Sequence, residues 1–142
     1  MRQKWSLTSE DVKKIVAACK KEAAKYNNEP TVAVVDEGGH LLYLERPDSH
    51  RPNGVEMALG KARCAAFRGR PSSALEERGK DRPGFLFVPN CLPIRGGAPI
   101  NYRGATLGGV GISGIDVHDE EIAQVGVAAV VKKPRATRKK KA

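Results

Sequence analysis

A glycine-rich strand near the C-terminal end constrains this chain more than any other segment. Residues 105–113 read Ala-Thr-Leu-Gly-Gly-Val-Gly-Ile-Ser, so three glycines interrupt one short apolar run. Glycines weaken a strand and leave part of its face without side chains. Such a strand makes physical sense where a helix, a second subunit or a ligand comes very close, and packing is the simplest of these explanations.

A second segment is rich in small residues. A helix is predicted to begin after Asn53, an N-cap residue type, with Glu56 at the capping-box position. Its small residues are Ala58, Gly60, Ala62, Ala65 and Ala66. Small side chains let another backbone approach. The simplest interpretation of Lys61, which lies among them, is a side chain at the helix edge that extends into solvent.

Turn, cap and periodicity signals divide the rest of the chain into helices and hairpins. Thr8 is the predicted N-cap of the first helix, with Asp11 in the capping box. The other predicted elements are strands at 31–35 and 40–45, a short helix near 71–79, strands at 95–100 and 105–113, and a final helix capped by residues 116–119. Runs of hairpin strands with helices between them predict an α+β fold with an antiparallel sheet.

The final helix and the loop before the second hairpin carry specific expectations. The helix is predicted to bury Ile122, Ala123, Gly126, Val127, Ala129 and Val130. Its acidic residues, Asp116, Asp119, Glu120 and Glu121, fit a helix N-terminus without a catalytic role. The stretch 80–99 contains four prolines and no clear period, and so long a loop in a small domain is typical of a site or an interface.

The charge of the chain is concentrated at one end. The 142 residues hold 25 Lys and Arg against 16 Asp and Glu, but residues 132–142 supply seven of the positive charges. The remaining part is nearly neutral, and only 5% of residues are aromatic, which argues against a nucleic-acid-binding fold with stacking aromatics. We expect a folded domain over 1–131 and a disordered lysine-rich tail over 132–142.

Cysteine content and hydropathy exclude further classes. Cys19, Cys64 and Cys91 are odd in number and form no Cys-x-x-Cys pair, so neither a disulfide framework nor a zinc site is indicated. No apolar run approaches the roughly 20 residues that span a bilayer, and the first five residues lack the apolar stretch of a secretory signal. We therefore expect a soluble, cytoplasmic protein that makes no membrane contact.

Several separate blocks of sequence match one known family. They are residues 32–41 (Val-Ala-Val-Val-Asp-Glu-Gly-Gly-His-Leu), 46–48, 57–62, 96–100, 108–114 and 119–123. In order and spacing these blocks resemble the GlcG/HbpS-like family, which includes haem-binding proteins, glycolate-utilisation proteins and the C-terminal domain of PduO-type corrinoid adenosyltransferases. The resemblance implies a profilin-like sandwich, with an antiparallel sheet of about five strands flanked by helices. It also implies a homo-oligomer, from dimer to octamer.

The resemblance also bears on cofactors. Haem-binding members use a side-chain ligand to iron, and the PduO-type domain has a histidine early in its chain. This sequence has no histidine before His40, so that ligand has no counterpart here. His50, in a proline-flanked loop beside Arg46 and Asp48, is the best remaining candidate for a metal ligand.

The first functional hypothesis is a binding protein for an anionic small molecule such as haem, a corrinoid or a small organic acid. The loop 46–50 and the segment 95–98 are predicted to form the pocket walls, with glycine N–H groups and cations facing a carboxylate. The predicted ligand-binding residues are Arg46, His50, Arg95, Gly96, Gly97 and Ala98, with Lys61 as a further cation.

The second hypothesis is an enzyme of small-acid or aromatic-catabolite metabolism that works by proton transfer, as a tautomerase, isomerase or lyase. Its catalytic residues are predicted to be Asp48, His50 and Lys61, because burial and neighbouring charges can bring such groups into the neutral pH range. The sequence contains no nucleophile elbow and no phosphate-binding loop, which disfavours serine hydrolases and nucleotide hydrolases.

The third hypothesis concerns the basic tail. Seven cations can attract nucleic acid or another anionic surface weakly and in a salt-dependent manner. A solubilising extension is the simpler interpretation of the same residues.

Overall fold

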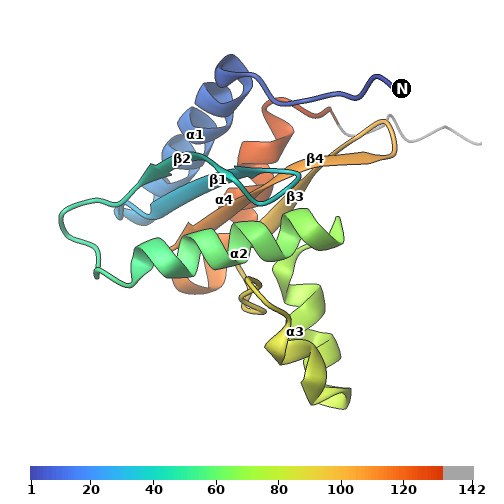
Figure 1. Cartoon of the computed structure of the whole chain (residues 1–142). Helices are drawn as coiled ribbons and strands as arrows, with labels where there is room; N and C mark the ends of the chain where they lie inside the picture. Colours follow the sequence, from blue (N-terminus) through green and yellow to red (C-terminus); the bar gives the residue numbers. More distant parts are fainter. Residues whose placement is uncertain (133–142) are drawn as a thin grey trace, which may run out of the picture.

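Two β-hairpins join into one four-stranded antiparallel sheet with helices on both of its faces (Figure 1). The computed structural model describes residues 1–132. Its elements are α1 (Ser9–Ala23), η1 (Ala24–Tyr26), β1 (Thr31–Asp36), β2 (Leu41–Glu45), α2 (Gly54–Arg68), α3 (Ser72–Asp81), η2 (Pro83–Phe87), β3 (Gly97–Tyr102), β4 (Ala105–Ser113), η3 (Asp116–His118) and α4 (Asp119–Ala128), where η marks a 3-10 helix. The predicted order of helices and hairpins is confirmed.

The strands of the sheet lie in the order β2-β1-β4-β3, so β2 and β3 are the edge strands. This arrangement confirms the α+β class, although the sheet has four strands where the family resemblance implied about five. The segment between η2 and β3 contains Pro89 and Pro93 and adds no strand. Prolines lack the N–H group that a strand ladder requires, which is consistent with this difference.

Strand β1 is buried on both faces, as its β-branched run predicted. Val32 and Val34 belong to a core shared with α1 and α4, and Ala33 and Val35 belong to a second core under α2. Figure 1 shows the two layers, with α2 on one side of the sheet and the pair α1 and α4 on the other. The alternation of side chains along a strand produces this division.

The helix ends confirm one cap prediction and correct another, and one predicted core residue is exposed. At α1, the Asp11 N–H donates to Thr8 Oγ1 at 3.2 Å and the Thr8 N–H donates to Asp11 Oδ2 at 2.9 Å, which is the predicted capping box. Asn53 precedes α2, but its side chain makes no capping hydrogen bond. Ala129 was predicted to be buried and is exposed, as is Ala128 before it, and Val127 and Val130 are half-buried, so this end of α4 and the turn after it lie at the surface.

Helix α2 packs against the glycines of β4. A helix is thus one of the three close neighbours that the glycine-rich strand allowed. A Cβ atom at Gly109 would overlap the carbonyl oxygen of Ala62, and one at Gly111 would overlap that of Ala58. The helix therefore rests with its backbone almost directly on the strand, and its small residues face the glycines. Of the three possible explanations, close packing against a helix of the same chain accounts for these two glycines.

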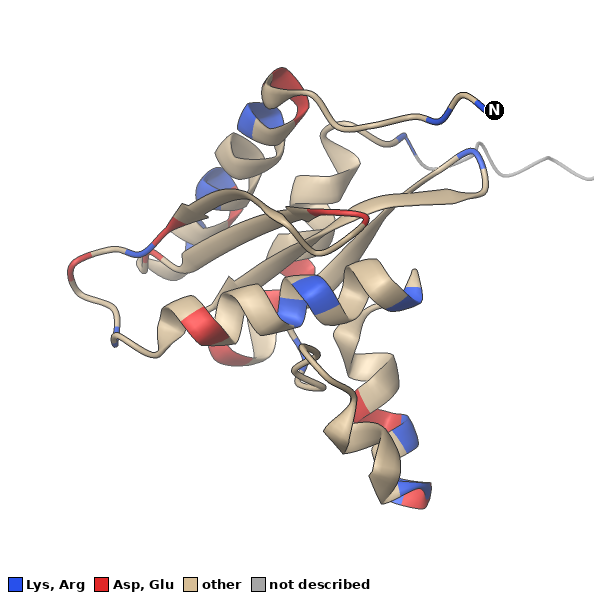
Figure 2. Cartoon of the chain, viewed as in Figure 1, with Lys and Arg blue, Asp and Glu red and all other residues tan. Residues whose placement is uncertain are grey.

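Residues 72–95, called the arm below, project from the body of the molecule (Figure 1). The arm consists of α3, η2 and the irregular segment up to Arg95, and α3 packs mainly against η2. Its N-terminal part is anchored, since Ser72 and Leu75 are buried, whereas Leu86 and Phe87 are exposed. Figure 2 shows basic and acidic residues side by side along α3.

Two expectations from the sequence concern the ends of the chain and membranes. The predicted lysine-rich tail lies outside the described residues, apart from Lys132. Within residues 1–132, no helix combines the length and the apolar character that are needed to cross a membrane.

Candidate functional site

Lys61, one of the candidate site residues, is buried in the interior of the protein. Its side chain is 3% exposed, and its ammonium donates to Asp119 Oδ2 at 3.1 Å and to the carbonyl oxygen of Ile112 at 2.9 Å. The expectation of a solvent-directed lysine at a helix edge is therefore wrong. Because its hydrogen bonds reach α4 and β4, Lys61 links α2 to both elements.

Asp119 has a role that its place in an acidic cluster did not indicate. The carboxylate is buried, and its Oδ1 accepts the N–H of Ile115 at 2.8 Å. Burial raises the pKa of the Asp119 carboxyl above its usual value, and the Lys61 ammonium opposes that rise. The sequence contains one signal of this pair, a lysine among the small apolar residues of α2. It contains no signal of the partner, because Asp119 is 58 positions away.

His50 sits in a tight enclosure at the end of its loop. Its Nδ1 atom shares a hydrogen bond with Thr31 Oγ1, and its ring lies against Gly54 and Gly114. Burial is the main cause that lowers the pKa of His50, and Asp119 acts in the opposite direction. The lowered pKa favours the neutral imidazole, which is the form that accepts a proton or binds a metal.

The position of Gly114 restricts iron binding by His50. A Cβ atom at Gly114 would lie 2.8 Å from His50 Nε2, so the Gly114 backbone already closes over that nitrogen. Because the other ring nitrogen is engaged by Thr31, Nε2 is the one that remains for a metal. An iron atom at Nε2 would require the Gly114 segment to move.

Arg46 and Asp48 lie on the same loop as His50 and face solvent. The Arg46 guanidinium donates to the carbonyl oxygen of His50 at 3.0 Å, so this side chain closes its own loop. Asp48 is exposed and makes no side-chain hydrogen bond or ion pair within residues 1–132. The structure places both residues near His50, but each faces outward.

The segment 95–98 uses its polar groups inside the fold. The Arg95 N–H donates to Glu76 Oε2 at 3.0 Å, and the Gly97 N–H donates to Ser72 Oγ at 2.8 Å. The carbonyl oxygen of Gly96 accepts the N–H of Ile112 at 2.9 Å. A carboxylate that used the Arg95 and Gly97 N–H groups, as the sequence predicted, would have to displace Glu76 and Ser72.

The two predicted pocket walls approach different members of the buried ion pair. A Cβ atom at Gly96 would lie 2.9 Å from Lys61 Nζ, and the Asp119 carboxylate acts to raise the pKa of His50. Among the hollows described for residues 1–132, none is lined by both the loop 46–50 and the segment 95–98.

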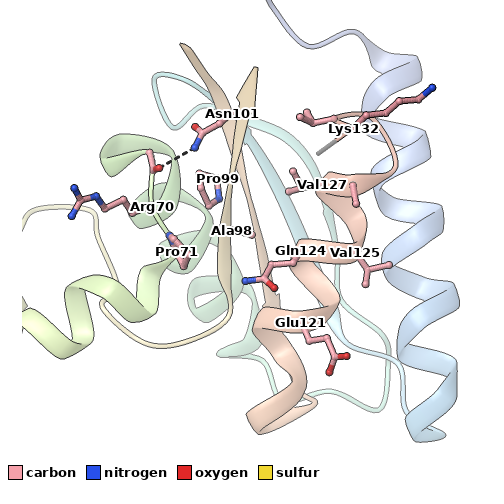
Figure 3. A pocket seen from close by; sticks show the side chains of 13 residues that line it. Arg70, Pro71, Ala98, Pro99, Asn101, Glu121, Gln124, Val125, Val127 and Lys132 are labelled. Atoms are coloured by element: carbon pink, nitrogen blue, oxygen red, sulfur yellow. Dashed lines mark hydrogen bonds between the residues drawn. The ribbon is translucent and has the colours of Figure 1, made fainter. Parts of the chain in front are cut away.

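A hollow of about 570 Å³ lies instead along the free edge of β3 (Figure 3). Of the residues predicted to bind a ligand, Ala98 alone lines it. The full lining is Gly69, Arg70, Pro71, Ala98, Pro99, Asn101, Glu121, Gln124, Val125, Val127, Ala128, Val131 and Lys132. The α2–α3 connection, β3 and α4 thus form its three sides.

Most of this lining is apolar, with polar groups at the margins. In Figure 3 Gln124 extends from α4 toward β3, whereas Arg70 and Lys132 extend away from the centre of the hollow. Asn101 donates to the carbonyl oxygen of Gly69 at 3.0 Å and holds the hairpin against the end of α2. The Glu121 carboxylate accepts from the Tyr26 hydroxyl at 3.2 Å. An apolar hollow of this size with few polar groups is typical of small-molecule sites.

The lining also limits how the hollow can hold haem. Its apolar surface and its marginal cations suit a flat apolar ring with carboxylate substituents. Histidine, cysteine, methionine and tyrosine, the usual axial ligands of haem iron, do not occur among the lining residues. The lining of this hollow within one chain therefore contains no usual ligand for haem iron.

Together, the fold and this hollow define an α+β protein that has a groove of small-molecule size at a sheet edge. The family described as "Haem degrading protein HbpS-like" matches residues 7–128. Protein GlcG of Escherichia coli (strain K12) is 34% identical over 134 residues, which is 94% of this chain and 100% of that relative. The chain belongs to the HbpS-like family.

Solved structures agree with this assignment. A double mutant of HbpS from Streptomyces reticuli is 32% identical, with a TM-score of 0.85 over 92% of this chain and 91% of the other. The PduOC:heme complex is 25% identical, with a TM-score of 0.79 over 89% of this chain and 96% of the other. The antiparallel sheet between helices is thus shared across these proteins.

Proposed function

We propose that this protein binds an anionic small molecule, with haem as the first candidate, in the hollow beside β3. The observation that carries the proposal is an apolar hollow of about 570 Å³ in a chain whose fold matches that of the PduOC:heme complex. Arg70 and Lys132 lie at its margin and can turn toward carboxylates of the ligand. A corrinoid or a small organic acid would use the same surface and cations.

Iron ligation by His50 is an alternative binding mode within this proposal, because His50 does not line the hollow beside β3. His50 is half-buried, its lowered pKa favours the neutral imidazole, and its loop carries Arg46 and Asp48. In this mode His50 would hold the iron of a bound haem after a shift of Gly114. The segment 95–98, with Arg95 as its cation, would contact that ligand once Glu76 and Ser72 release the N–H groups of Arg95 and Gly97.

Titration of the pure protein with haem, followed by the Soret absorption band, tests the binding site. Ala128 is exposed and lines the hollow, so Ala128→Trp fills the hollow at little cost to the core. We expect this variant to weaken haem binding at least tenfold. Ala129→Trp is the matched control, because Ala129 is exposed and lies outside the lining, and it should bind like the wild type.

The outcomes separate the elements of the proposal. No saturable spectral change would exclude haem, and equal weakening by both tryptophan variants would exclude this hollow as the site. His50→Ala tests the iron ligand. A shifted Soret band in that variant would support ligation by His50, and an unchanged band would contradict it.

A second candidate function, acid–base catalysis on a small acid, is favoured by the neutral imidazole of His50 beside the buried pair of Lys61 and Asp119. His50 would act as the base, Asp48 would assist at the loop, and Lys61 would hold the site through Asp119. Deuterium uptake from D₂O into a panel of 2-oxo and 2-hydroxy acids, followed by NMR, measures such proton transfer. We expect uptake that is lost in His50→Gln, and no uptake above the buffer rate would contradict this function.

Homo-oligomer formation, up to the octamer, is part of the same proposal. The edge strand β2 supports it, because Leu41 and Leu42 are 47% and 42% exposed on a strand with one free edge. Light scattering after size exclusion measures the mass directly. A monomer at all concentrations would contradict assembly.

Weak attraction of the basic tail to nucleic acid is a further proposal that rests on composition alone. Deletion of residues 132–142 should abolish any salt-sensitive DNA mobility shift. A shift that persists without these residues would contradict a role for the tail.

A further inference from the structure

Two arginines of the arm and one of α2 lie around the ring of Phe85, which belongs to the arm. The guanidinium carbons of Arg68, Arg78 and Arg82 lie 5.6, 4.6 and 5.1 Å from the centre of the Phe85 ring. These arginines come from the last turn of α2, from α3 and from the residue after α3. The fold therefore brings together three cations that are separated by up to 14 positions in the sequence.

None of the three arginines has a carboxylate partner within residues 1–132. The ion pairs and side-chain hydrogen bonds of this part of the chain do not include them. The carboxylates of α3 are engaged elsewhere, since Glu77 binds Lys80 at 2.7 Å and Glu76 accepts the Arg95 N–H. Asp81, the remaining acid of α3, adds one negative charge near Lys80.

This arrangement is electrostatically uncompensated. A single arginine over Phe85 would gain the attraction of a cation for an aromatic face. The second and third arginines add mutual repulsion, because all three guanidinium carbons lie within 5.6 Å of the same ring centre. A bound anion would remove that repulsion.

A hollow lies directly beside the cluster. It has a volume of about 480 Å³ and is lined by Arg82, Pro83, Gly84, Phe85 and Val88, with no acidic residue among them. A Cβ atom at Gly84 would meet no other atom within 4 Å, so the backbone there is open to a ligand. This hollow shares no lining residue with the one beside β3.

We propose that Arg68, Arg78 and Arg82 form a second binding site, for a small polyanion that carries phosphate groups or clustered carboxylates. Guanidinium groups bind such oxyanions with paired, charge-assisted hydrogen bonds. Phe85 and Val88 would contact the less polar part of the ligand in the hollow. The site is independent of the proposed function, and it gives the long proline-containing loop a role.

Titration calorimetry of the full chain with sodium pyrophosphate, and separately with citrate, tests the site at low salt. We expect saturable binding of at least one probe, weakened at least tenfold in Arg78→Gln. Arg103→Gln is the matched control, because Arg103 also lies 5.3 Å from an aromatic ring, that of Trp5, but outside the cluster. The basic tail is the same in all variants, so the difference between the two variants reports the cluster alone.

Each outcome bears on the proposal. Tighter binding of pyrophosphate would assign phosphate as the ligand chemistry, and tighter binding of citrate would assign clustered carboxylates. Saturable binding of neither probe, or equal affinity of Arg78→Gln and Arg103→Gln, would overturn the site. A circular dichroism spectrum identical to that of the wild type shows that each variant is folded.

Discussion

In the body of this protein the buried cation of Lys61 has Asp119 at 3.1 Å, whereas Arg68 of α2 and the arm residues Arg78 and Arg82 lie around Phe85 of the arm without a carboxylate partner among the described residues. Pairing is required in the body, because an unpaired buried charge is strongly destabilising. In the arm, water screens the cations and the fold tolerates them. The buried charges of the body therefore stabilise the fold, whereas the exposed arginines around Phe85 remain available to a ligand, as we propose above.

The body is also more tightly packed than the arm. In the body, Gly111 leaves no room for a side chain, because α2 lies directly on the strand. In the arm, Gly84 faces open space, and Phe87 is 82% exposed. Substitutions in the body should therefore change the free energy of unfolding, and those in the arm should leave it nearly unchanged.

Removal of the buried cation is expected to have the largest effect. Lys61→Met leaves the Asp119 carboxylate buried without its partner, which typically costs about 3–5 kcal/mol of unfolding free energy. Urea unfolding measures this loss. The double variant Lys61→Met/Asp119→Asn should recover a large part of it, because the asparagine is neutral and still accepts the Ile115 N–H.

The pH dependence of the same variant has a definite sign. Burial already raises the pKa of Asp119, and loss of Lys61 removes the attraction that opposes that rise. A raised carboxyl pKa favours the folded state at acidic pH and ceases to do so as the pH rises through the folded-state pKa. The deficit of Lys61→Met should therefore be smaller at pH 4.5 than at pH 7.5, and an equal deficit would contradict this account.

The second largest effect is expected at the contact between strand and helix. Gly111→Ala forces α2 away from β4 and should lower the unfolding free energy by about 3 kcal/mol, the upper end of the usual range for overpacking. Gly84→Ala is the matched control in the arm and should change it by less than about 0.5 kcal/mol. Similar losses in both variants would remove the distinction between the two regions.

A smaller effect is expected at His50, on the boundary between core and surface. Because burial lowers its pKa in the folded state, the unfolded chain binds protons more readily. The stability that neutral His50 contributes is present above its unfolded pKa, about 6.5, and is lost as the pH falls through the folded-state pKa. Urea unfolding between pH 7.5 and pH 5 should show this loss, and His50→Gln should reduce it more than His40→Gln does.

The smallest effect is expected in the arm itself. Arg82→Gln removes one exposed cation and one cation–aromatic contact, and it also relieves repulsion from Arg68 and Arg78. The unfolding free energy should therefore change by less than about 0.5 kcal/mol. A loss above about 2 kcal/mol would mean that the arginines stabilise the arm, as the ion pair of Lys61 and Asp119 stabilises the body.

The local features of this chain were predictable because their signals lie within a few residues of one another. Thr8 and Asp11 define a capping box, Gly38 and Gly39 define a turn, and β1 is a short β-branched run. The closeness of a helix to the glycines of β4 was one of three explanations at that stage. The assignment to α2 required the register that places Gly109 and Gly111 over Ala62 and Ala58.

The candidate sites were less predictable, since their groups come from distant segments. His50 and Gly96 were expected to face one pocket, but no described hollow is lined by both, and Gly96 lies against Lys61. The hollow beside β3 was indicated by Ala98 alone. The hollow forms because α4 and the α2–α3 connection lie on either side of the edge strand β3. No local sequence pattern encodes the spacing between these three segments.

The sequence by itself determined the order of elements, the antiparallel hairpins, the α+β class and the family, because caps, turns and alternating side chains act over short separations. Tertiary structure alone decided that Lys61 is buried against Asp119, that the groove lies at the edge of β3, and that three arginines meet at Phe85. Charges and cavities act through space, so their partners are chosen by packing and not by position along the chain.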